Sequence, residues 1–97
     1  WRVGILDDFN DFYDPSIKRR NIASLQGAEI FEGDIRDEQT VARAMRPGWD
    51  TVLHLAARAG VRPSIKSPGL YVATNVAGTS AMLEASVRTG VGTFLFA

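Results

Sequence analysis

Four short apolar runs, separated by stretches that carry helix signals, constrain the fold of this chain more than any other feature. The runs are rich in β-branched and aromatic residues and show no clean alternation of polar and apolar positions. This pattern is typical of strands that are buried on both faces of a parallel sheet. The four runs are Val3–Leu6, Ala28–Phe31, Thr51–Leu55 and Thr93–Phe96.

Residues that start and stop helices stand between these runs. The predicted helices cover residues 15–25, 38–45 and 68–88. A capping residue precedes each helix, and proline occupies the first position of two of them. The stop signals are glycines and a proline, which end helices because they leave the right-handed conformation or cannot continue it. These boundary residues are Asp14, Pro15, Gly27, Asp37, Pro47, Gly48, Ser67, Pro68 and Gly90.

The alternation of strands and helices predicts one α/β domain with right-handed crossovers, a parallel sheet and helices on both faces. Residues 56–67 form the least regular stretch. The longest helix carries an apolar stripe at helical spacing, which we expect to face the sheet, with Asn75 and Met82 at its edge. The stripe consists of Val72, Val76, Thr79, Leu83 and Val87.

Composition excludes several classes of function. The net charge is zero, so we expect no nucleic-acid partner, and the cluster Lys18-Arg19-Arg20 is interpreted as a solvated helix face. The chain has no cysteine and one histidine, which argues against a metal site. No apolar stretch is long enough for a membrane span and no signal pattern is present, so we expect a cytoplasmic location. Because the chain starts and stops on apolar runs, we expect it to be a piece of a longer protein.

Ligands of parallel α/β sheets bind outside the carboxyl ends of the strands, so the residues after each run are candidates for function. Asp7 follows the first run, where a carboxylate can hold a ribose diol and repel a 2′-phosphate, which favours NAD over NADP. The alternative is that Asp7 caps a turn. Asp8 is expected to point elsewhere, toward solvent.

Asp34 and Ile35 follow the second run. The carboxylate could bond the amino group of adenine while Ile35 packs on the ring, or Asp34 could simply form a turn. Ala56 and Ala57 follow the third run, where small side chains allow either a bulky ligand or a helix to approach. We interpret His54, inside that run, as a core residue.

Three further positions have a functional and a plain interpretation. Arg62 could pair with a carboxylate or phosphate, or be a solvated loop residue. Asn75 could donate to a carbonyl or ring oxygen, or be a polar residue on the helix surface. Gly78, inside a predicted helix, indicates close packing.

In this order, the motifs resemble the extended short-chain dehydrogenase/reductase family, which comprises NAD-dependent epimerases and dehydratases. Three segments carry the resemblance over nearly the whole chain: Gly33–Asp37, Val52–Arg62 and Thr74–Thr79. Within that family, Leu6–Pro15 and Ala59–Ser64 are similar to UDP-glucuronate 4-epimerases. The resemblance implies a Rossmann-like doubly wound parallel sheet that is incomplete, because the first βα unit and the C-terminal half are absent.

The resemblance also implies roles for residues. Asp7 would hold the adenosine ribose of NAD, with Asp34 and Ile35 at the adenine. Asp8 stands where the family usually has asparagine, and is a weaker candidate for the cofactor. The cofactor would be lined by Leu55, Ala56 and Ala57, with Asn75 supporting that side and Arg62 on the side of the nucleotide-sugar substrate. Homodimers are usual in the family, so the whole protein is expected to be one.

The family's catalytic residues are not found in this chain. Tyr13 is followed four positions later by Ile17, and Tyr71 by Asn75, so no Tyr-x-x-x-Lys occurs. We expect that motif after Ala97 and the glycine-rich pyrophosphate turn before Trp1, and hence neither turnover nor tight NAD binding by residues 1–97 alone. The reaction implied is reversible hydride exchange between C4 of the sugar and NAD, through a 4-keto sugar. A 4,6-dehydratase or decarboxylase, and a non-catalytic NAD-sensing relative, are the alternatives.

Overall fold

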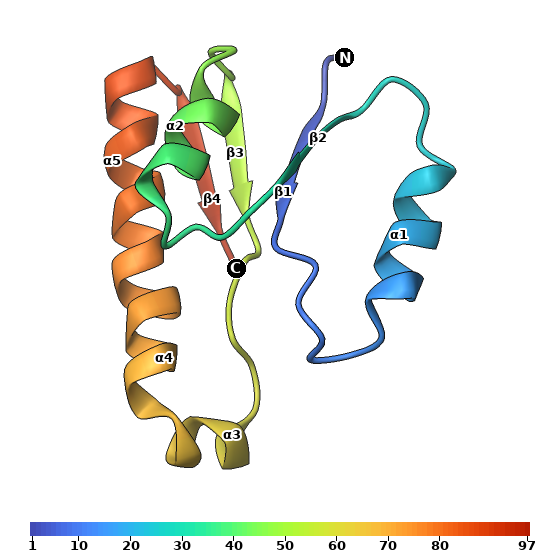
Figure 1. The fold of residues 1–97 in the computed structure, drawn as a ribbon. Coiled ribbons are helices and arrows are strands. Elements are labelled where there is room, and N and C mark those ends of the chain that lie inside the picture. Colours follow the sequence, from blue (N-terminus) through green and yellow to red (C-terminus); the bar gives the residue numbers. More distant parts are fainter.

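The computed structural model describes residues 1–97 and alternates strands with helices as predicted (Figure 1). Each predicted strand is present, and the long third helix is a column of three consecutive segments. The elements are β1 (Gly4–Asp7), α1 (Pro15–Ala23), β2 (Glu29–Glu32), α2 (Glu38–Met45), β3 (Thr51–His54), α3 (Val61–Lys66), α4 (Pro68–Val72), the π-helix η1 (Ala73–Gly78), α5 (Thr79–Thr89) and β4 (Thr93–Phe96).

Two of the three predicted N-caps bond the first turn of their helix, whereas the side chain of Ser67 makes no capping hydrogen bond. Asp14 accepts a hydrogen bond from the Ser16 N–H at 3.0 Å, and Asp37 accepts one from the Gln39 N–H at 3.2 Å. Gly90 follows α5 with φ of 78°, in the left-handed region where a side chain would be strained. The starts of α1 and α2 and the end of α5 therefore follow from local sequence signals that the structure confirms, whereas α1 ends at Ala23, before the predicted stop at Gly27.

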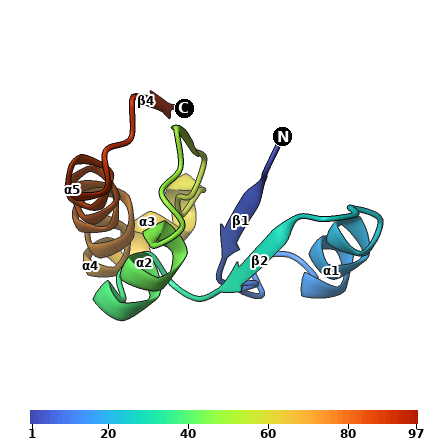
Figure 2. The same ribbon diagram turned by 90° about the horizontal axis from the view of Figure 1, so that it is seen from above.

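The strands pair in parallel, but in two separate pairs. β1 pairs with β2 and β3 pairs with β4, and no ladder joins β1 to β3. β1 is nevertheless the strand that lies nearer to β3 (Figure 2). In the doubly wound order 3-2-1-4-5-6, strand 1 lies between strands 2 and 4. β1 and β3 of this chain take the places of strands 2 and 4 on the two sides of the gap. The predicted incomplete parallel sheet is confirmed. It consists of two separate pairs of strands.

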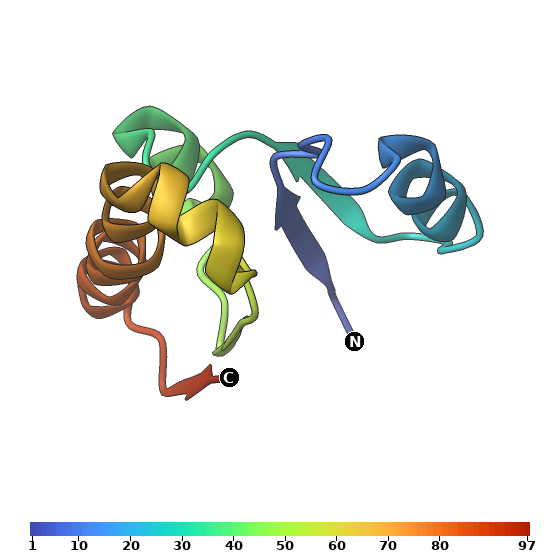
Figure 3. The ribbon, with the colours of Figure 1, turned by 90° about the horizontal axis from the view of Figure 1, so that it is seen from below.

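The core lies on one face of β3–β4. There α2 and the α4–η1–α5 column pack on the strands, Leu6 of β1 packs against the same core, and α1 lies on the far side of β1–β2 (Figures 2 and 3). The buried apolar cluster consists of Ile35, Val41, Met45, Val52, Met82 and Ala85. The other face of this pair is exposed at Leu53, Leu55 and Leu95, and none of the helices of residues 1–97 covers it. None of the helices has the length and apolar character needed to cross a membrane.

The apolar stripe of the long helix faces outward, contrary to the prediction. Val76 is 63% exposed and Val87 is 82% exposed. The buried positions of the column are Thr74, Gly78, Met82, Ala85 and Ser86, and all of them except Met82 are small or polar. The spacing of apolar residues predicts a helix with two different faces, but it does not predict which face packs inward. Here the face with small side chains packs inward because it allows closer contact. At Gly78, a Cβ atom would lie 2.7 Å from Ile35 Cδ1, which explains the glycine as predicted.

The stretch that was expected to be irregular, residues 56–67, contains the short helix α3. Gly60 precedes it with φ of 101°, a conformation that favours glycine. Pro63 is tolerated because it lies in the first turn, where backbone N–H groups have no partner within the helix.

Candidate functional site

Asp7 ends β1, and its carboxylate is already engaged on one side. Oδ1 accepts hydrogen bonds from the Phe9 N–H at 2.8 Å and from Lys18 Nζ at 2.9 Å. The alternative interpretation, in which Asp7 caps a turn, is therefore confirmed. The hydrogen bonds in the structure leave Oδ2 of Asp7 without a partner, and the side chain is 33% exposed. One carboxylate oxygen remains for a ligand at this strand end.

The basic cluster on α1 is exposed at Arg19 and Arg20, as predicted for a solvated face, but Lys18 is not. Lys18 turns back to Asp7 and also lies 5.2 Å from the centre of the Tyr13 ring. Arg19 bonds Glu32 at 2.7 Å and stacks over Phe9 at 4.4 Å. Arg20 is the member of the cluster that is exposed and makes no ion pair. The sequence does contain a signal for these ion pairs, because an acidic residue ends each of the two strands that flank α1, Asp7 in β1 and Glu32 in β2.

The loop after β1 has an uncommon backbone. Phe9 has φ of 50°, which is a rare conformation for a bulky residue, and its ring is buried. Asp8 accepts hydrogen bonds at Oδ1 from the backbone and side chain of Asn10, at 3.2 and 2.7 Å. Asp8 is therefore used within its own turn and is half-buried, whereas the sequence suggested a solvent-facing side chain.

Asp34 follows β2 and forms the turn that was the alternative interpretation. Its Oδ1 accepts from the Arg36 N–H at 2.8 Å, and its Oδ2 accepts from Arg36 Nε and Nη2 at 2.9 and 2.6 Å. These hydrogen bonds from Arg36 lower the pKa of Asp34 despite its partial burial. An adenine amino group at this position would have to share a carboxylate with Arg36.

Ile35 lies in the core. It is 7% exposed and packs against the column at Gly78, where a Cβ atom would meet its Cγ1 at 2.8 Å. Its structural role is thus to join the loop after β2 to the long helix. The predicted contact with adenine stays a prediction.

Asn75 lies in η1 and fixes the loop after β3. Its Oδ1 accepts from the Arg58 N–H at 2.7 Å and its Nδ2 donates to the Arg58 carbonyl at 3.0 Å. Tyr71 donates to the Ala59 carbonyl at 2.7 Å. Single π-turns within helices occur often at functional sites, and this one aims a side-chain amide at the backbone of the loop. The sequence analysis did not predict the contacts of Arg58 and Tyr71. Each contact involves a backbone group of the loop, and residue types do not indicate such groups.

We expect that replacing Asn75 by alanine in the whole protein destabilises it by about 1–3 kcal/mol. The reason is that two backbone groups of Arg58 would lose their partner in a partly buried position. Thermal melting measures this change, at roughly 2–4 °C for each kcal/mol. Asn75→Asp keeps the acceptor for the Arg58 N–H but turns a carboxylate oxygen toward the Arg58 carbonyl, so its loss should be at least as large as that of alanine. Equal melting temperatures for wild type and Asn75→Ala would contradict this role.

His54 is a core residue, as predicted. It is 4% exposed, and its Nε2 lies 3.0 Å from Thr79 Oγ1. Thr79 donates to the Asn75 carbonyl at 2.7 Å, so β3 and η1 are joined through this hydroxyl. Burial lowers the pKa of His54, which keeps the ring neutral at neutral pH.

The remaining candidates lie along the loop after β3. Leu55 is 66% exposed, Ala57 is exposed, and Ala56 is half-buried against the core cluster. Arg62 is exposed on α3 and makes no ion pair. The structure thus places the loop at the same edge of the strands as Asp7 and Asp34, while Arg62 lies beyond it, on the short helix at the end of the molecule (Figure 1).

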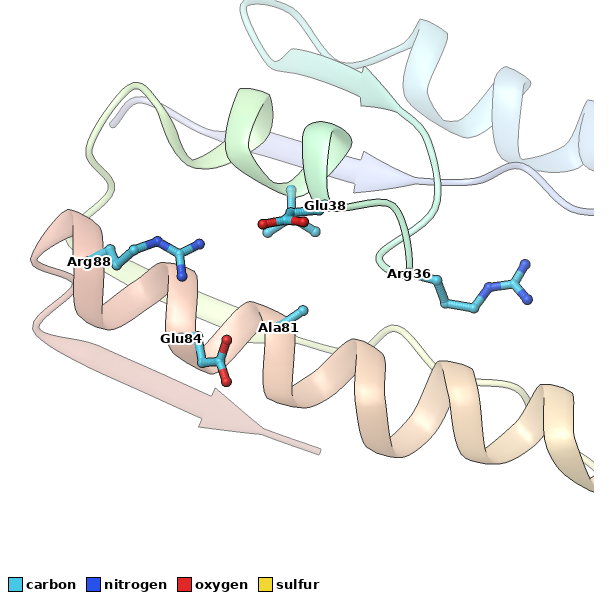
Figure 4. A pocket seen from close by; sticks show the side chains of 6 residues that line it. Arg36, Glu38, Ala81, Glu84 and Arg88 are labelled. Carbon is cyan, nitrogen blue, oxygen red and sulfur yellow. The ribbon is translucent and has the colours of Figure 1, made fainter.

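A hollow of about 270 Å³ lies elsewhere, between α2 and α5 (Figure 4). It is lined by Arg36, Glu38, Val41, Ala81, Glu84 and Arg88. Charges of both signs surround it, and the side chain of Arg36 points away from the other labelled residues. It contains none of the predicted site residues.

Comparison with known proteins places this geometry in a family. UDP-glucuronate 4-epimerase 4 of Arabidopsis thaliana is 45% identical over 82 residues, which cover 81% of this chain and 19% of the relative. The dTDP-glucose 4,6-dehydratase of Streptomyces antibioticus is 41% identical, over 77% of this chain and 22% of the relative. This chain therefore spans about a fifth of the length of these relatives.

A solved structure shows the same arrangement. The UDP-glucose 4-epimerase of Thermus thermophilus, in complex with NAD, superposes with a TM-score of 0.81 at 32% identity. The match covers 95% of this chain and 28% of that one. Residues 12–97 also match the sequence profile described as the NAD dependent epimerase/dehydratase family. The chain thus belongs to the NAD-dependent epimerase/dehydratase family of enzymes.

Proposed function

We propose that the whole protein is an NAD-dependent nucleotide-sugar 4-epimerase that acts on UDP-glucuronate through a transient 4-keto sugar. The observation that carries the proposal is the free Oδ2 of Asp7 at the carboxyl end of β1, in a chain of this family. An oxygen placed there suits a vicinal diol, because a hydroxyl can donate to it. NAD would supply reversible hydride exchange at C4 of the sugar.

The residues of this chain would bind and orient the cofactor. Asp7 would hold the adenosine ribose, with Asp8 nearby in the same turn. Asp34 and Ile35 would lie at the adenine. Leu55, Ala56 and Ala57 would line the cofactor along a loop that Asn75 fixes through the backbone of Arg58. Apart from Asn75, which lies in η1, these residues lie at the carboxyl ends of β1, β2 and β3, and this supports the assignments.

We propose that Arg62 faces the sugar-nucleotide. Its guanidinium is exposed and not committed to a carboxylate of this chain. A guanidinium can bind a carboxylate or phosphate through two parallel hydrogen bonds. UDP-glucuronate offers both groups. We further propose that the whole protein is a homodimer and resides in the cytoplasm.

The similarity to a dTDP-glucose 4,6-dehydratase favours a second candidate, a dehydratase or decarboxylase on another nucleotide sugar. A non-catalytic NAD-sensing relative is the third candidate. The three differ in chemistry: epimerisation conserves the substrate's formula, dehydration or decarboxylation releases a small molecule, and the sensor binds without turnover.

The decisive experiment incubates the purified whole protein with UDP-glucuronate and NAD, and follows the products by chromatography and NMR. We expect UDP-galacturonate to appear until the two sugars are in equilibrium. A mass loss corresponding to water or carbon dioxide would favour the second candidate. Tight NAD binding with no change in any nucleotide sugar tested would favour the sensor and contradict the epimerase.

A further inference from the structure

His54 is a core residue that makes one directional bond, which packing alone does not require. Its ring is 4% exposed and lies beside the rings of Phe94 and Phe96, with centroids 5.7 and 5.9 Å away. Nε2 of this ring lies 3.0 Å from Thr79 Oγ1, which is 25 positions further along the chain. A buried side chain of β3 is thus tied to the α4–η1–α5 column at a single hydroxyl.

The directions of the hydrogen bonds at this hydroxyl follow from the acceptor at the far end. Asn75 contributes a carbonyl, which can only accept, so Thr79 Oγ1 donates its single hydrogen to it, at 2.7 Å. Toward His54 the hydroxyl is therefore an acceptor, and Nε2 of the ring carries the hydrogen. The chain of donors runs from His54 through Thr79 to the backbone of Asn75.

Asn75 is fixed both at its backbone and at its side chain. A threonine hydroxyl that bonds the carbonyl four residues earlier bends a helix, and here the bond starts within the π-helix η1. The side-chain amide of Asn75 accepts from the Arg58 N–H at 2.7 Å and donates to the Arg58 carbonyl at 3.0 Å. The position of the Asn75 backbone, which Thr79 holds, therefore decides where the amide holds the loop after β3.

The surroundings of the ring make this bond sensitive to acid. The rings of Phe94 and Phe96 on β4 and the Thr79 hydroxyl on the column are uncharged, and burial is what lowers the pKa of His54. A protonated ring would be buried without a counter-charge, which is unfavourable. A ring released from the core has the ordinary histidine pKa of about 6.5, so a fall in pH below that value favours the released state.

We propose that Thr79 and His54 are positioning residues, which hold the loop after β3 in the conformation that binds the cofactor. Both act through Asn75 and not on the cofactor directly. This inference rests on the proposed NAD binding of the whole protein. It makes the affinity for NAD depend on the Thr79 hydroxyl and on the protonation of His54, whereas a role in packing alone would affect stability and leave that affinity unchanged.

The first test removes and restores the hydroxyl in the whole protein, with NAD affinity measured by calorimetry. Thr79→Val keeps the shape of the side chain but loses the hydroxyl, so we expect NAD to bind about 3- to 10-fold more weakly, as for one lost hydrogen bond. Thr79→Ser retains the hydroxyl and should bind NAD like the wild type. Thr89→Val is the matched control, because Thr89 Oγ1 makes the same kind of bond, to the Ala85 carbonyl at 2.9 Å, at the other end of α5. It should leave NAD affinity unchanged.

The second test varies the pH from about 8 to about 5.5, across the ordinary pKa of histidine. We expect the NAD affinity of the wild type to fall by up to about tenfold for each pH unit below about 6.5, because release of the ring takes up one proton. His54→Gln keeps an N–H donor but cannot be protonated, so its affinity should fall less over the same range. The difference between the two profiles separates His54 from the other groups that titrate.

Melting curves at each pH identify any protein that is not folded, and Thr79→Ala replaces Thr79→Val if the valine variant does not fold. Wild-type NAD affinity in the variant without the hydroxyl would overturn the inference, even with a lowered melting temperature. Identical pH profiles for wild type and His54→Gln would also overturn it, and both results leave the proposed function standing. Failure of the wild type to bind NAD at any pH would overturn the proposed function and this inference with it.

Discussion

Replacing Asp7 by alanine in the whole protein is expected to weaken NAD binding by about 10- to 100-fold. A carboxylate that accepts hydrogen bonds from a ribose contributes roughly 1.5–3 kcal/mol, and each 1.4 kcal/mol is about a factor of ten in affinity. Titration calorimetry with NAD measures the change. The effect is large because Oδ2 is the carboxylate oxygen of Asp7 that accepts no hydrogen bond from this chain, whereas Oδ1 accepts two.

Two further variants separate binding from folding in this experiment. Asp7→Asn keeps an acceptor for the Phe9 N–H, so the turn and its positive φ should persist. Asp11→Ala removes an exposed carboxylate from the same loop, whose side chain makes no ion pair, and should leave NAD affinity unchanged. Unchanged NAD affinity in Asp7→Ala would remove Asp7 from the site.

Replacing Gly33 by alanine is expected to destabilise the whole protein by about 1–3 kcal/mol, through overpacking. A Cβ atom at this position would lie 2.8 Å from Thr40 Oγ1 and 3.2 Å from Thr40 Cβ. Thr40 is 5% exposed, and its hydroxyl donates to Asp37 Oδ2 at 2.6 Å. Because a β-branched side chain in a helix has few rotamers, Thr40 can move only by giving up this bond. Thermal melting should show a fall of roughly 2–4 °C for each kcal/mol.

The same substitution at Gly69 is the matched control. No atom lies within 4 Å of a Cβ built there, and the residue is in α4, so alanine should be neutral or should stabilise the helix by up to about 1 kcal/mol. Combining Gly33→Ala with Thr40→Ala should cost less than the sum of the two single changes, because the clash is relieved. An unchanged melting temperature in Gly33→Ala would show that α2 adjusts freely, contrary to the packing described here.

Local signals were sufficient for the four strands and for the helices other than α3, which lies in a stretch expected to be irregular. Asp14 and Asp37 cap helices through bonds to residues two positions away, so the relevant chemistry lies within one turn. The four apolar runs became strands, and their parallel pairing followed from the alternation with helices. Asp7, Asp34 and Ala56 were placed at one edge of the strands for the same reason.

Sequence patterns did not predict which face of the long helix packs inward or where charged side chains point. The stripe that includes Val76 and Val87 has helical spacing, but the opposite face of the column packs inward because small residues allow closer contact. The engagement of Asp7 by Lys18 and of Asp34 by Arg36 depends on where side chains point after the turns have formed. Neither the rotation of a helix about its axis nor the direction of a long side chain is encoded by spacing alone.

By itself, the sequence determined the class of fold, the strand ends at which chemistry is expected and the family whose motifs the chain carries, since all of these depend on neighbouring residues and their order. The tertiary structure alone decided that Lys18 meets Asp7 across 11 positions of sequence, that Asn75 reaches across 17 to the backbone of Arg58, and that the strands form two pairs. The physical reason is that these contacts join segments far apart in the chain, and their geometry exists only once the helices and strands have packed.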